Sequence, residues 1–118
     1  MKKVIVQDTD PDLLETLNLV LKEAKFEVLP LLHYQEVFNK IQTFSPNLVL
    51  LDFKLSGEES IRICKLIKKS FPGLPVIALS CNMNIQETYA KAGFDNYIEK
   101  PFDLNDLLSV VQNCSCQY

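Results

Sequence analysis

Polar side chains that could act together in phosphoryl transfer follow four apolar runs of the chain: Gln7 with Asp8, then Asp52, Ser80 and Lys100. Two carboxylates at close range repel each other, which favours a divalent cation between them. Mg²⁺ fits best, because it takes one or two carboxylates, keeps several waters and accepts phosphate oxygens. A carboxylate can also attack phosphorus as a nucleophile. A hydroxyl and an ammonium can neutralise the peripheral oxygens of the transferred group.

The elements that must position these residues alternate between strands and helices. The apolar runs are rich in Leu and β-branched residues without polar alternation, which is typical of strands buried on both faces. We predict strands over residues 4–6, 27–31, 48–51, 76–79 and 96–98. Apolar residues at helical spacing predict five helices, over residues 11–25 and around 37–41, 61–67, 85–92 and 104–111.

Capping residues mark several of the predicted helix starts. Asp10 is a favourable N-cap with Pro11 at the first helical position, and Asp103 is the expected N-cap of the last helix. Ser56 and Glu59 have capping-box spacing before the third helix.

Strands separated by helices imply parallel pairing with right-handed crossovers, hence a three-layer α/β sandwich. The carboxyl ends of parallel strands share one edge of the sheet, where ligands bind in open α/β folds. If the first strand lies beside the third, Asp8 meets Asp52 there, flanked by Ser80 and Lys100. Each residue alone could be a helix cap, a loop hydroxyl or a solvated lysine, but their joint placement favours a functional site.

Composition limits the other function classes. The chain has 118 residues, which we interpret as one domain over 1–118, with 47% hydrophobic residues and a net charge of -3. The absence of a basic run argues against direct binding of nucleic acid by this domain. No apolar stretch reaches the roughly 20 residues of a membrane span, and a first strand beginning at residue 4 leaves no room for a signal peptide. We therefore expect a cytoplasmic protein with no membrane partner, whose four cysteines are free thiols.

Four segments carry a resemblance to a known family: "VIVQD", "LVLLDFKLSGEE", "PVIALS" and "AGFDNYIEKPF". The chain resembles, over its whole length, the chemotaxis-regulator-like receiver domain of two-component response regulators. The resemblance implies a flavodoxin-like (βα)5 fold, with a five-stranded parallel sheet of order 2-1-3-4-5. It also implies that Asp52 is the phosphoacceptor and that Asp8, Asp52 and the backbone carbonyl of Lys54 bind Mg²⁺.

The resemblance further implies a switch and a set of partners. Ser80 and Lys100 would assist catalysis, Tyr97 would turn inward when Ser80 moves, and the Lys100–Pro101 peptide would be cis. A histidine kinase or phosphotransfer protein would donate the phosphoryl group. A downstream protein, a fused output domain or a second copy of the chain would read the changed surface of the fourth helix, fifth strand and fifth helix. The domain would assist its own phosphorylation and dephosphorylation and would not otherwise be an enzyme.

Gln7 departs from the family pattern, because it stands where the family usually has an acid. An amide oxygen can still accept from a metal-bound water, so we expect weakened Mg²⁺ binding. The same residue favours an alternative, a degenerate receiver that docks to a partner without phosphorylation. Enzyme alternatives have less support. The loop "QDTDP" lacks a Gly- and hydroxyl-rich phosphate cradle for a flavin, and an aspartyl phosphatase would want an acid where Lys54 stands.

Overall fold

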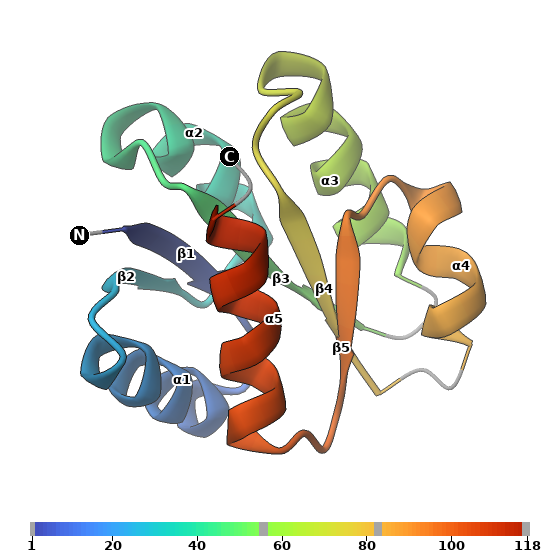
Figure 1. The fold of residues 1–118 in the computed structure, drawn as a ribbon. Coiled ribbons are helices and arrows are strands. Elements are labelled where there is room, and N and C mark those ends of the chain that lie inside the picture. The colour runs from blue at the N-terminus through green and yellow to red at the C-terminus, as the bar shows by residue number, and fades with distance from the viewer. Residues whose placement is uncertain (1, 55–56, 82–83, 117–118) are drawn as a thin grey trace.

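The computed structural model describes residues 2–54, 57–81 and 84–116, with side chains to residue 114. In this part of the chain, strands and helices alternate (Figure 1): β1 Lys3–Gln7, α1 Pro11–Glu23, β2 Glu27–Leu31, α2 Tyr34–Phe44, β3 Leu48–Phe53, α3 Glu58–Ser70, β4 Val76–Ser80, α4 Ile85–Ala92, β5 Asn96–Glu99 and α5 Leu104–Cys116. The strands are all parallel and lie in the order β2-β1-β3-β4-β5. The predicted flavodoxin-like fold is confirmed.

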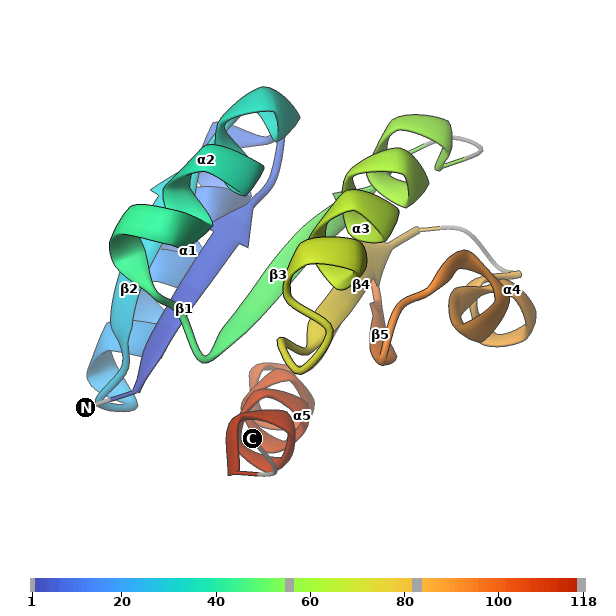
Figure 2. The same cartoon turned by 90° about the horizontal axis from the view of Figure 1, so that it is seen from above.

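The sheet has a hydrophobic core on each face. One core joins α2, α3 and α4 to the sheet and the other joins α1 and α5, so that Figure 2 shows α5 across the sheet from α2 and α3. In β3, Leu48 and Leu50 belong to the α1/α5 core, whereas Val49 and Leu51 belong to the opposite core. Burial on both faces explains why the apolar runs do not alternate with polar residues.

The two strands beside β3 stop pairing with it at different residues near Asp52. β3 extends beyond the predicted residue 51, because β4 pairs Asp52 with Leu79 and Phe53 with Ser80. On its other side β3 loses its partner earlier, because the β1 pairing ends with Gln7 opposite Leu51. Asp52 therefore lies one residue beyond the last β1–β3 pair.

The predicted caps can be compared with the observed helix starts. Asp10 precedes α1 and its carboxylate accepts the backbone N–H groups of Asp12 and Leu13. Asp103 accepts from the N–H of Asn105 at 2.7 Å. Both N-cap predictions are thus confirmed. Helix α3 begins after Gly57, and Ser56 of the predicted capping box lies outside the described residues.

Gly57 is required by its surroundings. Its φ of 76° is a left-handed conformation that side chains rarely adopt, and an added Cβ would overlap the ring of Phe53. The turn into α3 is therefore packed directly against the residue that follows Asp52.

Candidate functional site

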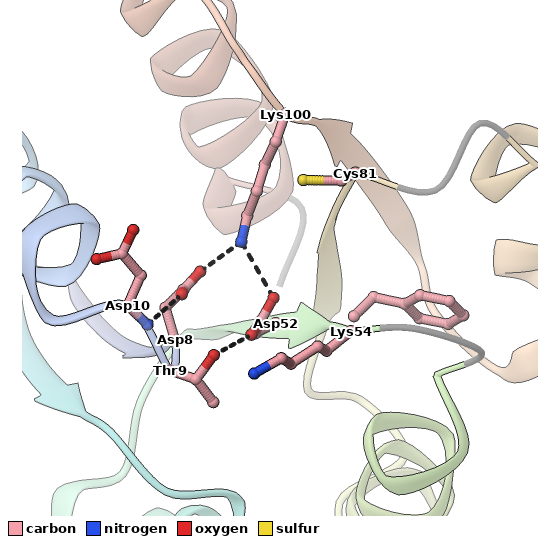
Figure 3. Close-up of a pocket in the computed structure, with 8 residues that line it drawn as sticks. Asp8, Thr9, Asp10, Asp52, Lys54, Cys81 and Lys100 are labelled. Carbon is pink, nitrogen blue, oxygen red and sulfur yellow. Dashed lines mark hydrogen bonds and ion pairs between the residues drawn. The ribbon is translucent and has the colours of Figure 1, made fainter.

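Three of the predicted site residues meet at the carboxyl edge of the sheet (Figure 3). Asp8 follows β1, Asp52 lies in β3 and Lys100 follows β5. The Lys100 ammonium donates to Asp8 Oδ2 at 2.7 Å and to Asp52 Oδ1 at 3.1 Å. The acids are only 1% and 4% exposed. Two buried carboxylates therefore share a single cation, which leaves this cluster with a net negative charge.

The shared contacts hold Lys100 in its charged form. Burial by itself lowers the pKa of Lys100, but the hydrogen bonds and negative charges of Asp8 and Asp52 outweigh that effect. The pKa of Lys100 is consequently raised above the ordinary lysine value.

The other carboxylate oxygens also have donors. Asp8 Oδ1 accepts the backbone N–H of Asp10 at 2.9 Å, and Asp52 Oδ2 accepts the Thr9 hydroxyl at 3.1 Å. Thr9 was not predicted as a site residue, although its position directly after Asp8 was a usable signal. With Lys100 on one oxygen and Thr9 on the other, the Asp52 carboxylate is held in one orientation.

A cavity of about 560 Å³ opens over these groups. Its lining consists of Asp8, Thr9, Asp10, Asp52, Phe53, Lys54, Cys81 and Lys100. The predicted hydroxyl residue, Ser80, is fully buried at the end of β4 and is not among the lining residues, whereas the exposed Cys81 is. The backbone N–H of Lys100 donates to the Ser80 carbonyl at 2.7 Å, which ties the two predicted catalytic residues together.

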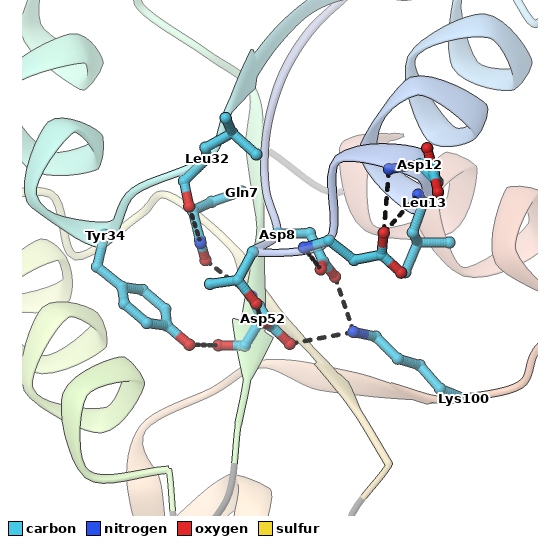
Figure 4. A network of polar contacts seen from close by, with 10 residues as sticks. Gln7, Asp8, Asp12, Leu13, Leu32, Tyr34, Asp52 and Lys100 are labelled. Atoms are coloured by element: carbon cyan, nitrogen blue, oxygen red, sulfur yellow. Dashed lines mark hydrogen bonds and ion pairs between the residues drawn. The ribbon is translucent and has the colours of Figure 1, made fainter.

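The amide of Gln7 is fully buried and engaged at both ends (Figure 4). Its nitrogen donates to the Leu32 carbonyl at 3.0 Å, and its oxygen accepts the backbone N–H of Asp52 at 3.2 Å. The oxygen has a second lone pair that could accept from a metal-bound water. That predicted contact stays a prediction.

Tyr34, at the start of α2, was not identified from the sequence. Its buried hydroxyl donates to the backbone carbonyl of Asp52 at 2.8 Å. Burial raises the pKa of Tyr34, and the charges of Asp52 and Asp8 raise it further, against a backbone hydrogen bond from Lys54. The phenol therefore stays protonated and remains a hydrogen-bond donor.

The available donors suit a hard divalent cation. Asp8 and Asp52 supply carboxylate oxygens, and the Lys54 carbonyl, which accepts the Gly57 N–H at 2.9 Å, has a lone pair left. Among the described residues there is no group of three or more His, Cys, Asp or Glu able to hold a metal. An all-oxygen set that leaves positions for water and phosphate fits Mg²⁺ better than metals that prefer nitrogen or sulfur ligands.

The predicted switch aromatic, Tyr97, lies within β5, the outermost strand beside β4, and pairs with Ala78. Tyr97 is half-buried in β5, and its ring packs on Tyr89 of α4 with the centroids 4.9 Å apart. The Lys100–Pro101 peptide is cis.

Comparison with known proteins identifies the class that this fold and site define. The sequence matches the family described as the response regulator receiver domain over residues 4–112. The chain therefore belongs to the receiver domain family of two-component response regulators, which serves phosphorylation-dependent signalling.

Particular relatives support this assignment. The chain is 27% identical over 113 residues to the DNA-binding response regulator MtrA of Mycolicibacterium smegmatis, covering 94% of this chain and 49% of that protein. A CheY-like receiver domain protein from Methanospirillum hungatei has a TM-score of 0.87 at 26% identity, covering 99% of this chain and 95% of the other. The TrrA response regulator of Thermotoga maritima, solved in complex with Mg²⁺ and BeF, has a TM-score of 0.86 at 24% identity, with coverage of 97% and 99%.

Two further findings concern the extent of the chain and membranes. The chain spans about half the length of the MtrA proteins it matches.

Within the described residues, none of the helices has the length and apolar character needed to cross a membrane.

Proposed function

We propose that Asp52 accepts a phosphoryl group from a histidine kinase or a phosphotransfer protein in the presence of Mg²⁺. The observation that carries this proposal is the buried pair Asp8 and Asp52, which share the single ammonium of Lys100 beneath an open cavity. The cluster needs further positive charge and has room above it for a phosphoryl group.

The transfer follows from the chemistry of these groups. An oxygen of Asp52 forms a bond to phosphorus while the bond from phosphorus to the donor's imidazole nitrogen breaks, and the imidazole keeps the electron pair. Lys100 stays charged and neutralises one peripheral oxygen of the phosphoryl group. Asp8, Asp52 and the Lys54 carbonyl would hold Mg²⁺, which neutralises further charge on the phosphoryl oxygens.

Phosphorylation then changes the surface beside the site. The aspartyl phosphate adds about -1.5 to -2 charge and new acceptor oxygens, which attract Lys100 and the Ser80 hydroxyl. Movement of Ser80 makes room for the half-buried Tyr97, and the α4, β5 and α5 surface changes. The recipient is a downstream protein, a fused output domain or a second copy. The larger size of MtrA, a DNA-binding response regulator, supports a fused output domain.

Gln7 sets how much Mg²⁺ the transfer requires. Although Gln7 does not line the cavity, the second lone pair of its neutral oxygen would accept from a metal-bound water, with less attraction than a carboxylate would give. We expect Gln7→Asp to tighten Mg²⁺ binding in a titration followed by intrinsic tyrosine fluorescence or NMR. Unchanged affinity would show that residue 7 makes no contribution to the metal site.

The test is incubation with acetyl phosphate and Mg²⁺, followed by intact-mass measurement. The wild type should gain one phosphoryl group per chain, Asp52→Asn should gain none, and Asp12→Asn on the exposed surface of α1 should behave as wild type. If the wild type gains no phosphoryl group at any Mg²⁺ concentration, the domain is instead a phosphorylation-independent docking module.

A further inference from the structure

The backbone of Asp52 lies where strand pairing on one side has ended. The β1–β3 ladder stops with Gln7 opposite Leu51, so no β1 residue pairs with Asp52. The carboxylate of Asp52 is thus carried by a peptide segment that has lost the support of one neighbouring strand.

Two side chains replace the missing strand (Figure 4). The Gln7 oxygen accepts the Asp52 N–H at 3.2 Å, and the Tyr34 hydroxyl donates to the Asp52 carbonyl at 2.8 Å. Gln7 is fully buried and Tyr34 is 8% exposed, so water competes little for either contact. Both backbone groups of Asp52 are therefore fixed by side chains from β1 and α2.

The Gln7 amide is suited to this arrangement in a way that an acid is not. Its nitrogen donates to the Leu32 carbonyl at 3.0 Å while its oxygen accepts from Asp52. A carboxylate could accept from Asp52 but has no proton for Leu32, and it would place a buried negative charge against a carbonyl oxygen. The chemistry of the two partners thus accounts for an amide at position 7.

We propose that Gln7 and Tyr34 form a backbone clamp that positions the Asp52 carboxylate for phosphoryl transfer. The two are positioning residues, because neither lines the cavity over the carboxylates. This inference rests on the proposed function of Asp52. The physical reason is that the rate of transfer depends on the geometry of the attacking oxygen, and a backbone free to shift spreads that oxygen over unproductive positions.

The first experiment tests the clamp without any phosphorylation. Tyr34→Phe removes only the hydroxyl, so NMR should show the Asp52 carbonyl ¹³C resonance moving upfield. Gln7→Met keeps the side-chain length but removes the amide, so the Asp52 N–H should exchange with solvent about tenfold faster. The control is Val37→Ala, in the same core as Tyr34 but with a side chain that cannot form a hydrogen bond to Asp52. It should leave the Asp52 carbonyl resonance in place.

The second experiment measures the rate of phosphorylation by acetyl phosphate at saturating Mg²⁺, well below the melting temperature of each variant. Tyr34→Phe and Gln7→Met should each react about three- to tenfold more slowly than the wild type, as expected for the loss of one positioning hydrogen bond. Val37→Ala should keep the wild-type rate although it is less stable. A purely structural role would lower the stability of all three variants and change none of the rates.

The outcomes separate the two proposals. If the wild type is phosphorylated and Tyr34→Phe reacts at the wild-type rate, the clamp has no role in transfer and the inference is overturned. If the wild type is never phosphorylated, the proposed function and the positioning role fall together, and the NMR experiment still decides whether the backbone contacts exist. An unchanged Asp52 carbonyl resonance in Tyr34→Phe would by itself overturn the clamp.

Discussion

The molecule has Lys–Asp ion pairs at opposite edges of its sheet, and the two are built differently. At the edge where the strands begin, Lys68 of α3 contacts Asp95 at 3.0 Å, with the side chains 25% and 27% exposed. Lys68 also donates to the Leu74 carbonyl at 3.0 Å, and Asp95 accepts the Val76 N–H at 2.8 Å. One cation meets one anion there, and nearby backbone groups satisfy both.

At the edge where the strands end, Lys100 faces both Asp8 and Asp52, whose side chains are only 1% and 5% exposed. The Lys68–Asp95 pair is neutral, and its remaining hydrogen bonds are made with nearby backbone groups, as expected of a purely structural contact. The second carries excess negative charge beneath a cavity, which is costly for the fold and useful for binding a cation and a phosphoryl group. Charge balance therefore separates the two pairs more clearly than distance does.

The largest expected difference between the pairs is in phosphorylation rate. Lys100→Met should slow phosphorylation by acetyl phosphate about 100-fold, because it removes a preorganised cation from the phosphoryl oxygens. Lys68→Met should leave the rate unchanged. Time courses of intact mass give both rates. An equal decrease in phosphorylation rate in the two variants would show that charge balance does not distinguish a functional ion pair from a structural one.

Stability should respond in the opposite order. Asp95→Ala leaves the Val76 N–H without its acceptor and removes the carboxylate partner of Lys68, which should lower the free energy of unfolding by about 1–3 kcal/mol. Asp52→Ala removes one of two repelling buried acids while Asp8 still pairs with Lys100, so it should not lower stability and should raise it by up to about 1 kcal/mol. Urea denaturation measures both values. A larger loss in Asp52→Ala than in Asp95→Ala would contradict the comparison.

Mg²⁺ should stabilise the protein through the cluster of Asp8, Asp52 and Lys100, and the Lys68–Asp95 pair should make no contribution. At a concentration of about ten times its dissociation constant, Mg²⁺ should add about 1.4 kcal/mol to the stability of the wild type and raise its melting temperature. Lys68→Met should keep this shift, and Asp8→Asn should lose most of it. Thermal melts with Mg²⁺ and with EDTA make the comparison, and a full shift in Asp8→Asn would exclude Asp8 as a ligand.

Alkaline pH gives the smallest expected effect. The pKa of Lys100 is raised above its ordinary value of 10.5, and that of Tyr34 above 10.0. Each group therefore contributes stability that is complete below its ordinary pKa and is lost as the pH rises through its raised, folded-state pKa. Wild-type stability should fall above about pH 10, and less steeply in Lys100→Met and Tyr34→Phe. Parallel curves for wild type and Lys100→Met would contradict a stabilising role for the charged lysine.

Much of the fold follows from local pattern. The strand predicted over residues 27–31 is observed with the same limits, and the Asp10 and Asp103 caps are found where local chemistry placed them. The other strands extend past their predicted ends because their limits depend on partners. β3, for example, continues to Phe53 because β4 supplies Ser80 opposite it.

The chain by itself determined that Asp8, Asp52 and Lys100 would meet, because parallel strands bring their carboxyl ends to one edge. Only the tertiary structure decided how Asp52 is held. Thr9 and Tyr34 contact it across 43 and 18 positions of sequence, and the engagement of both ends of Gln7 depends on where β1 stops. Residue type and spacing specify which elements form and which ends adjoin. The partner of a single hydroxyl or amide is set by the packing of elements far apart in the chain.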